Sequence, residues 1–141
     1  MTDRSREEVS DPSRRLTGRG SGGSIEERVA QLAAEATAAR EQFEPPADPP
    51  DRDRAHTLLR EGFGPTVWVY VEAHTSGRNH RFTPAELASL QGTMNDWLEL
   101  YARCYGVDLE AAFTVRKAAE LLLETHNVYD AAQLLTRVPE R

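Results

Sequence analysis

Apolar side chains recur at every third or fourth position after Thr83, which is the spacing of one face of an α-helix. The residues in this stripe are Leu87, Leu90, Met94, Trp97, Tyr101 and Cys104. The preceding Thr83-Pro84-Ala85-Glu86 has the order of a helix start, because Thr83 and Glu86 can each accept a free backbone N–H and proline suits the first helical position. Gly106 predicts the end of the helix. We expect the other helices to dock on this one, with Trp97 as its most buried large side chain.

Residues 24–44 carry a second stripe with helical spacing. Ser24 and Glu27 again match a capping box, and the apolar positions that follow are Ile25, Val29, Leu32, Ala36, Ala39 and Phe43. Four prolines in residues 45–50 predict a stiff linker that holds this helix apart from a helical domain over 51–138. Because such a stripe needs a cover, either the domain's own groove or a second chain, we expect a protein partner or self-association through the helix Ile25–Phe43.

The rest of the chain predicts shorter helices. One covers residues 51–61 and stops at Gly62, and the last covers Val128–Arg137. Between the helix that begins at Thr83 and the last helix, Asp108 could cap a helix that runs through residues 109–125. Thr114 could interrupt that helix by starting a capped segment of its own.

Residues 66–74 fit two structures. Their β-branched and aromatic side chains favour a strand that could pair with residues 78–82. Pro65 also suits the first position of a helix, Gly77 suits its end, and no third strand is visible, so we favour the helix. The predicted fold class is therefore all-α, a small irregular or orthogonal bundle of five to six helices, with one short β-hairpin over residues 67–82 as the alternative.

Residues 1–23 are poor in core-forming side chains. They hold two aliphatic residues beyond the initiator methionine, Val9 and Leu16, among Ser, Arg, Asp, Glu, Gly and Pro. Such a segment cannot bury enough apolar surface to offset the entropy of ordering it, so we predict a disordered tail.

Charge and cysteine content narrow the function classes. The chain has 17 basic and 23 acidic residues, a formal charge of −6, which argues against nucleic acid and against an anionic membrane surface as partners. The longest fully apolar run, Val67–Val71, is far shorter than the ~20 residues that span a bilayer, and no secretory signal is visible. The single cysteine, Cys104, lies on the inward stripe and predicts a buried, inert thiol in a reducing, cytoplasmic location.

Few polar residues are candidates for a binding or metal site, and they lie near one loop. Arg78-Asn79-His80-Arg81 is a dense basic cluster that could hold a phosphate or an acidic patch of a partner, or be a solvated loop. Glu72, His74 and His80 could supply oxygen and imidazole donors to a divalent metal, but their spacing matches no standard ligand motif. We predict no catalytic residue, no metal ligand and no cofactor.

An aromatic set falls on two neighbouring elements. Its members are Trp68, Tyr70, Trp97, Tyr101 and Tyr105. Such a set can line a ligand pocket or form the centre of a core, and we favour the core.

One short segment resembles a known family. Residues 114–122, Thr-Val-Arg-Lys-Ala-Ala-Glu-Leu-Leu, resemble the first helix of excisionase-type helix-turn-helix domains. The resemblance implies a turn at 123–127 and a recognition helix at Val128–Arg137 that enters the major groove of DNA. That helix carries a single basic residue, Arg137, and an inward face of the core explains the same Ala-Ala-x-Leu-Leu pattern.

The sequence does not by itself assign a biochemical activity. The leading hypothesis is a non-catalytic cytoplasmic protein-interaction module. The alternatives are a helix-turn-helix DNA-binding or transcription-associated protein and a small metal-dependent enzyme.

Overall fold

The computed structural model describes residues 24–75 and 81–140, and its regular secondary structure there is entirely helical. The elements are α2 (Ile25–Gln42), α3 (Arg52–Leu58), the π-helical turn η2 (Leu59–Phe63), α4 (Gly64–Thr75), α5 (Pro84–Arg103), α6 (Val115–Thr125) and α7 (Val128–Thr136). The all-α prediction is confirmed, and residues 66–74 form a helix rather than a hairpin strand. The predicted tail over residues 1–23 lies outside the described residues.

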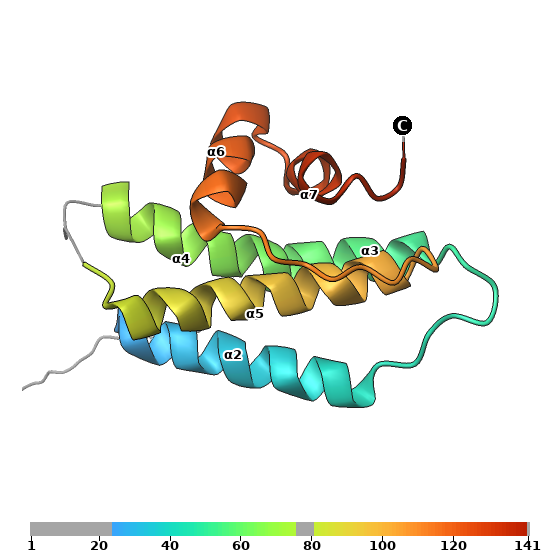
Figure 1. Cartoon of the computed structure of the whole chain (residues 1–141), viewed down its shortest axis with the longest axis horizontal. Coiled ribbons are helices and arrows are strands. Elements are labelled where there is room, and N and C mark those ends of the chain that lie inside the picture. The colour runs from blue at the N-terminus through green and yellow to red at the C-terminus, as the bar shows by residue number, and fades with distance from the viewer. Residues whose placement is uncertain (1–23, 76–80, 141) are drawn as a thin grey trace, which may run out of the picture.

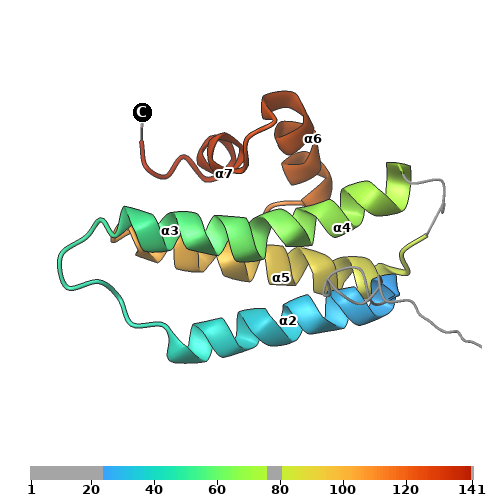
Figure 2. The same cartoon turned by 180° about the vertical axis from the view of Figure 1, so that it is seen from behind.

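The long elements lie side by side. α2, α5 and the nearly continuous rod of α3, η2 and α4 form the body of the bundle, and α6 and α7 cover the side of that rod opposite to α2 (Figures 1 and 2). After α5, residues 107–114 run back along α5 as an extended segment before α6 begins (Figure 1). No helix in the described part of the chain is long and apolar enough to cross a membrane.

α5 begins as the sequence predicts. The Thr83 hydroxyl accepts a hydrogen bond from the Glu86 backbone N–H at 3.1 Å, and the Glu86 carboxylate accepts one from the Thr83 N–H at 2.9 Å. The inward face buries Leu90, Met94, Leu98, Leu100 and Tyr101 completely or nearly so. Trp97 is also buried, at 6% exposure, but the prediction that it is the most buried large side chain of this helix is wrong, because Met94 is fully buried and Tyr101 is only 2% exposed.

α2 belongs to the same core as the other helices. Its residues Ile25, Val29, Leu32 and Ala36 are buried against α5, α4 and η2. Arg40 reaches Asp96 and Glu99 of α5 at 3.2 and 3.0 Å, and Arg28 reaches Glu72 of α4 at 2.9 Å. Of the two covers that the sequence left open for this stripe, the structure shows the chain's own helices.

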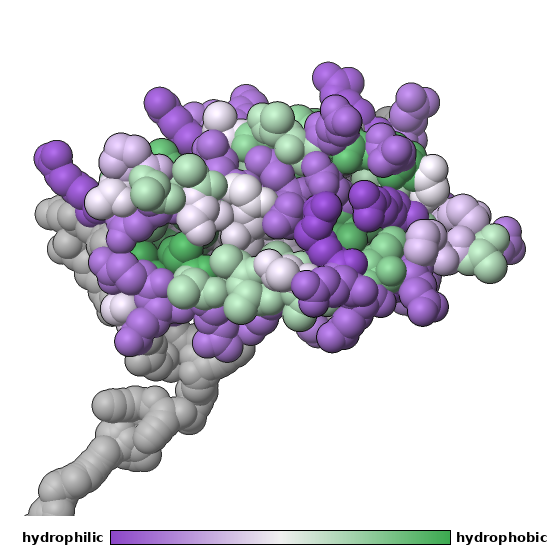
Figure 3. Space-filling model, turned by 60° about the horizontal axis from the view of Figure 1, so that its bottom comes forward, coloured by the Kyte–Doolittle hydropathy of each residue, from purple (hydrophilic) through white to green (hydrophobic). Residues whose placement is uncertain are grey.

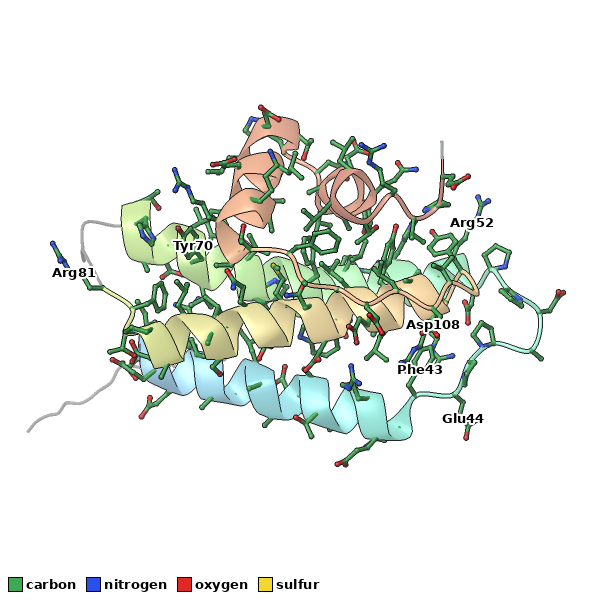
Figure 4. All side chains as sticks on the ribbon, viewed as in Figure 1. Phe43, Glu44, Arg52, Tyr70, Arg81 and Asp108 are labelled. Carbon is green, nitrogen blue, oxygen red and sulfur yellow. The ribbon has the colours of Figure 1, made fainter. Side chains whose placement is uncertain are left out.

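The proline-rich segment closes the bundle at the end where α2 finishes. The Arg54 guanidinium lies 4.2 Å from the centre of the Phe43 ring and donates to the Glu44 carbonyl at 2.7 Å. The Asp51 N–H donates to the Cys104 carbonyl at 2.8 Å. Figure 4 shows Phe43, Glu44, Arg52 and Asp108 gathered at this end, so the linker returns the chain to the common core instead of holding two units apart.

Gly62 does not stop a helix, which corrects the sequence-based boundary. The helix continues through η2 into α4. A Cβ on Gly62 would lie 2.3–2.6 Å from the indole atoms of Trp97, so the glycine is needed for close helix packing. The wide π turn precedes Pro65, whose ring would clash with the carbonyl four residues earlier in a regular α-helix.

The helix expected over residues 109–125 is too long by six residues, since α6 begins only at Val115. Thr114, the interruption that the sequence allowed, is its N-cap and accepts from the Lys117 N–H at 3.1 Å. His126, in the left-handed conformation (φ 53°), ends α6, and Asn127 caps α7 through the N–H groups of Tyr129 and Asp130.

Candidate functional site

The predicted basic cluster is described only at its last residue. Arg78, Asn79 and His80 lie outside the described residues, and Arg81 is exposed at the end of the molecule opposite to Phe43 (Figure 4). Next to Arg81, the ring of Phe82 lies parallel to that of Tyr70 with centroids 6.1 Å apart, and the His74 ring lies 4.4 Å from that of Tyr70. These rings fix the start of α5 against the end of α4.

The residues hypothesised to hold a metal do not form a ligand set in the described structure. The Glu72 carboxylate accepts from Arg28, and Nδ1 of His74 lies 2.9 Å from the Tyr70 carbonyl oxygen. His80, the third residue, is not described. Among the residues that are described, no group of three His, Cys, Asp or Glu side chains could hold a metal ion.

Cys104 is a core residue. Its side chain is fully buried, and this burial raises the pKa of the thiol to about 11, with Arg54 lowering it and Asp51 raising it by smaller amounts. Because the thiolate is the nucleophilic form, a thiol with this pKa is unreactive at neutral pH. The prediction of a buried, inert thiol is consistent with this environment.

The aromatic set is not one core cluster, which corrects the favoured interpretation at one position. Trp97 and Tyr101 are buried and Tyr70 and Tyr105 are partly buried, but Trp68 is 50% exposed. The neighbouring valines of α4 take the inward positions, and the helical period leaves Trp68 on the outward face with Glu72. Since nearly all of residues 66–71 are apolar, the sequence offered no polar face from which this could be read.

α6 and α7 form a pair of helices joined at His126 and Asn127. The second helix begins at Val128 as the resemblance implies, but α6 continues through Thr125, so the turn is shorter than the implied 123–127. Val115, Ala118 and Ala119 are buried, so the matching residues pack in the core. The exposed Arg116 and Lys117 lie 3.6 and 3.8 Å from the Glu120 carboxylate.

A row of polar side chains on α5 holds residues 111–114 extended, up to the start of α6 at Val115. The Asn95 side chain both accepts from the N–H and donates to the carbonyl of Phe113, each at 3.0 Å. One turn away on either side, Glu99 accepts from the Ala111 N–H at 2.9 Å and Gln91 accepts from the Val115 N–H at 3.0 Å. Gln91, Asn95 and Glu99 thus replace one neighbouring strand, and we call them the α5 ladder.

The α5 ladder was missed by the sequence analysis, although its spacing is visible. Its three residues recur at every fourth position beside the apolar stripe of α5, which places them on one helix face. Side chains that accept and donate at this period can serve a backbone lying along the helix. The pattern alone does not distinguish such a role from a solvated polar face.

A family model described as a domain of unknown function (DUF8055) matches residues 23–140. The chain belongs to this family. A search of curated proteins and a search of solved structures each found no match. The family match covers every helix described above, so the whole bundle is the family's domain.

Proposed function

We propose that the chain is a non-catalytic protein-interaction module whose main contact surface is centred on Trp68 of α4. The observation that carries this proposal is the half-exposed indole. Tryptophan is enriched among the residues that dominate binding energy at protein interfaces, because it buries a large apolar area with few torsions to fix.

The surroundings of Trp68 support an interface. Glu72 lies four residues further along the same face of α4 and pairs with Arg28 of α2 at 2.9 Å. Both side chains are partly exposed, at 27% and 18%. An apolar anchor beside a hydrogen-bonded charged pair has the composition of an interface centre with its polar rim.

We propose that the outward face of the helix Ile25–Phe43 also contributes to the contact surface. Its inward stripe is covered, but Ala30, Ala34 and Ala38 are exposed on its other side. Figure 3 shows pale, weakly hydrophobic residues gathered between hydrophilic ones on the side of the molecule where α2 lies. A partner, or a second copy, that contacts Trp68 could extend over this face. The single cysteine supports a cytoplasmic setting for this module.

Photo-crosslinking tests this surface directly. A benzoylphenylalanine in place of Trp68 should give discrete crosslinked products in cells of the source organism. The same group in place of Leu134, which is 41% exposed on α7, is the matched control and should give none. Products at the mass of a dimer would identify self-association. No product from position 68, or the same products from both positions, contradicts the proposal.

A second candidate is DNA binding through α6 and α7, favoured by the helix pair at 115–136 that resembles a helix-turn-helix. It predicts a mobility shift of duplex DNA at low salt that weakens as salt rises and on Arg137→Ala, because phosphate contacts release counterions. Arg81→Ala, at the end of the domain near the start of α5, is the control. No shift at low salt eliminates this candidate.

A further inference from the structure

We propose that the outer edge of residues 108–112 pairs, in antiparallel β fashion, with an extended segment of a partner protein whose alternate side chains are basic. The proposal adds a second surface to the proposed interaction function and depends on no property of Trp68.

The starting point is that one backbone edge of the chain from Ala111 to Val115 bonds to α5. In an extended chain, the N–H and C=O of successive residues point to opposite edges. The N–H groups of Ala111, Phe113 and Val115 point toward α5, where the α5 ladder accepts them. The backbone groups of Glu110 and Ala112 must therefore point to the other edge.

That outer edge is open. Asp108, Glu110 and Ala112 are exposed, and within residues 24–75 and 81–140 the backbone N–H and C=O groups of Glu110 and Ala112 have no hydrogen-bonding partner in the protein. A row of unpaired backbone groups in extended conformation is a template for an added strand. Because the α5 ladder already holds Ala111 and Phe113, a partner strand would bear less of the entropy of ordering this segment.

The acidic side chains along this edge indicate which kind of partner strand it would bind. Asp108 and Glu110 are two residues apart and so share a face of the extended segment. A basic side chain directly opposite each carboxylate would be a favourable cross-strand pair. A second copy of this chain paired edge to edge would instead place acidic residues close to acidic residues. The edge therefore fits a foreign strand with Lys or Arg at every second position.

Antiparallel pairing also determines which N–H groups of the partner strand would bond to this edge. In an antiparallel pair, residues directly opposite each other lie on the same face, and those opposite Glu110 exchange hydrogen bonds with it. The basic residues of the partner should therefore be the ones whose N–H groups bond to this edge. The intervening residues should direct their N–H groups away from the protein.

The test uses the full chain and a labelled peptide, acetyl-Lys-Val-Lys-Val-Lys-amide. We expect saturable binding by fluorescence anisotropy, with slowed hydrogen exchange of the Glu110 and Ala112 amides by NMR. N-methylation of the central lysine should weaken binding at least about tenfold, because it removes an edge hydrogen bond, whereas N-methylation of a valine should leave it unchanged. Equal binding by the two methylated peptides, or no protection at residues 110 and 112, overturns the proposal.

Variants of the chain give an independent arm. Ala112→Pro removes a donor of the open edge and should weaken binding about tenfold, while the matched Ala112→Ser keeps the N–H and should bind as the wild type does. Trp68→Ala should also bind the peptide normally, so a failure of this inference is distinguishable from a failure of the Trp68 surface. A dimer that forms through residues 108–112 in place of peptide binding would overturn the proposal as well.

Discussion

At the scale of single residues, Gly62 and Trp97 determine how closely the α3–η2–α4 rod approaches α5. The indole occupies the space that a Cβ at position 62 would need. Trp97 remains in this position although its indole N–H is buried without a hydrogen-bond partner in the described structure. An unpaired buried donor destabilises a fold, so the packing of the ring must outweigh that cost.

Gly62→Ala should destabilise the protein by about 1–3 kcal/mol, because the added methyl group overpacks the contact with Trp97. The matched variant is Gly92→Ala on α5, where a Cβ would meet nothing within 4 Å. Gly92→Ala should stabilise the protein by about 0.5–1 kcal/mol through helix propensity. Urea unfolding followed by circular dichroism measures both, and equal effects of the two alanines would contradict the role assigned to Gly62.

The burial of Cys104 should make the stability of the fold depend on pH in the alkaline range. Burial raises the pKa of its thiol to about 11 from an ordinary value near 9, so the unfolded chain loses this proton at a lower pH than the folded chain does. The stabilisation is complete below the ordinary pKa and is lost as pH rises toward 11. The melting temperature of the wild type should therefore fall between pH 9 and about 11 more steeply than that of Cys104→Ala. Burial also raises the pKa of Tyr101 in both proteins, and the Cys104 charge adds to that rise in the wild type alone, so this coupling acts in the same direction as the Cys104 thiol itself. Parallel melting curves across this range would refute the assignment.

At the scale of elements, α5 uses one face to contact the other helices and another face to bond to the extended segment that follows it. Its apolar stripe packs against α2 and the rod, and the α5 ladder bonds to the backbone of Ala111, Phe113 and Val115. The N–H and C=O of Phe113 both bond to the amide side chain of Asn95. An amide suits this position because it can both donate and accept, as an extended backbone residue does.

Asn95→Ala should cost about 1–3 kcal/mol, since it leaves the partly buried N–H and C=O of Phe113 without partners. Hydrogen exchange of the amides of residues 111–115 should also become faster relative to the helices. Ser89→Ala, at an exposed position of the same helix, is the control and should change stability by less than about 0.5 kcal/mol. Unchanged exchange at Phe113 in Asn95→Ala would mean that the ladder does not hold the segment.

At the scale of the whole molecule, α2 is a structural component of the bundle. It covers α5 and α4 with four buried side chains and with the ion pairs of Arg28 and Arg40. Most helix stability in proteins comes from such tertiary packing of an apolar face. The contact of Phe43 with Arg54 anchors the end of α2 to α3.

Deletion of residues 1–50 should therefore abolish cooperative unfolding and expose apolar surface that binds a hydrophobic dye. Deletion of residues 1–23 alone should leave the melting temperature within a few degrees of that of the full chain. Calorimetry and dye fluorescence distinguish the two shortened chains. A residue 51–141 fragment that melts as cooperatively as the full chain would show that α2 is not needed for the fold.

The local pattern of the sequence determined which segments are helical and where several of them begin. The capping boxes at Ser24 and Thr83, the proline at position 84 and the glycine at 106 act through bonds and torsions within a few residues, so they can be read without knowing the fold. The tertiary structure decided what these elements contact. Gly62 has the sequence context of a helix stop but serves close packing, Trp68 belongs to an apolar run but faces solvent, and residues 109–113 could be helical but bond to the α5 ladder. Each of these depends on partners distant in the chain, and a one-dimensional pattern does not contain the distances between them.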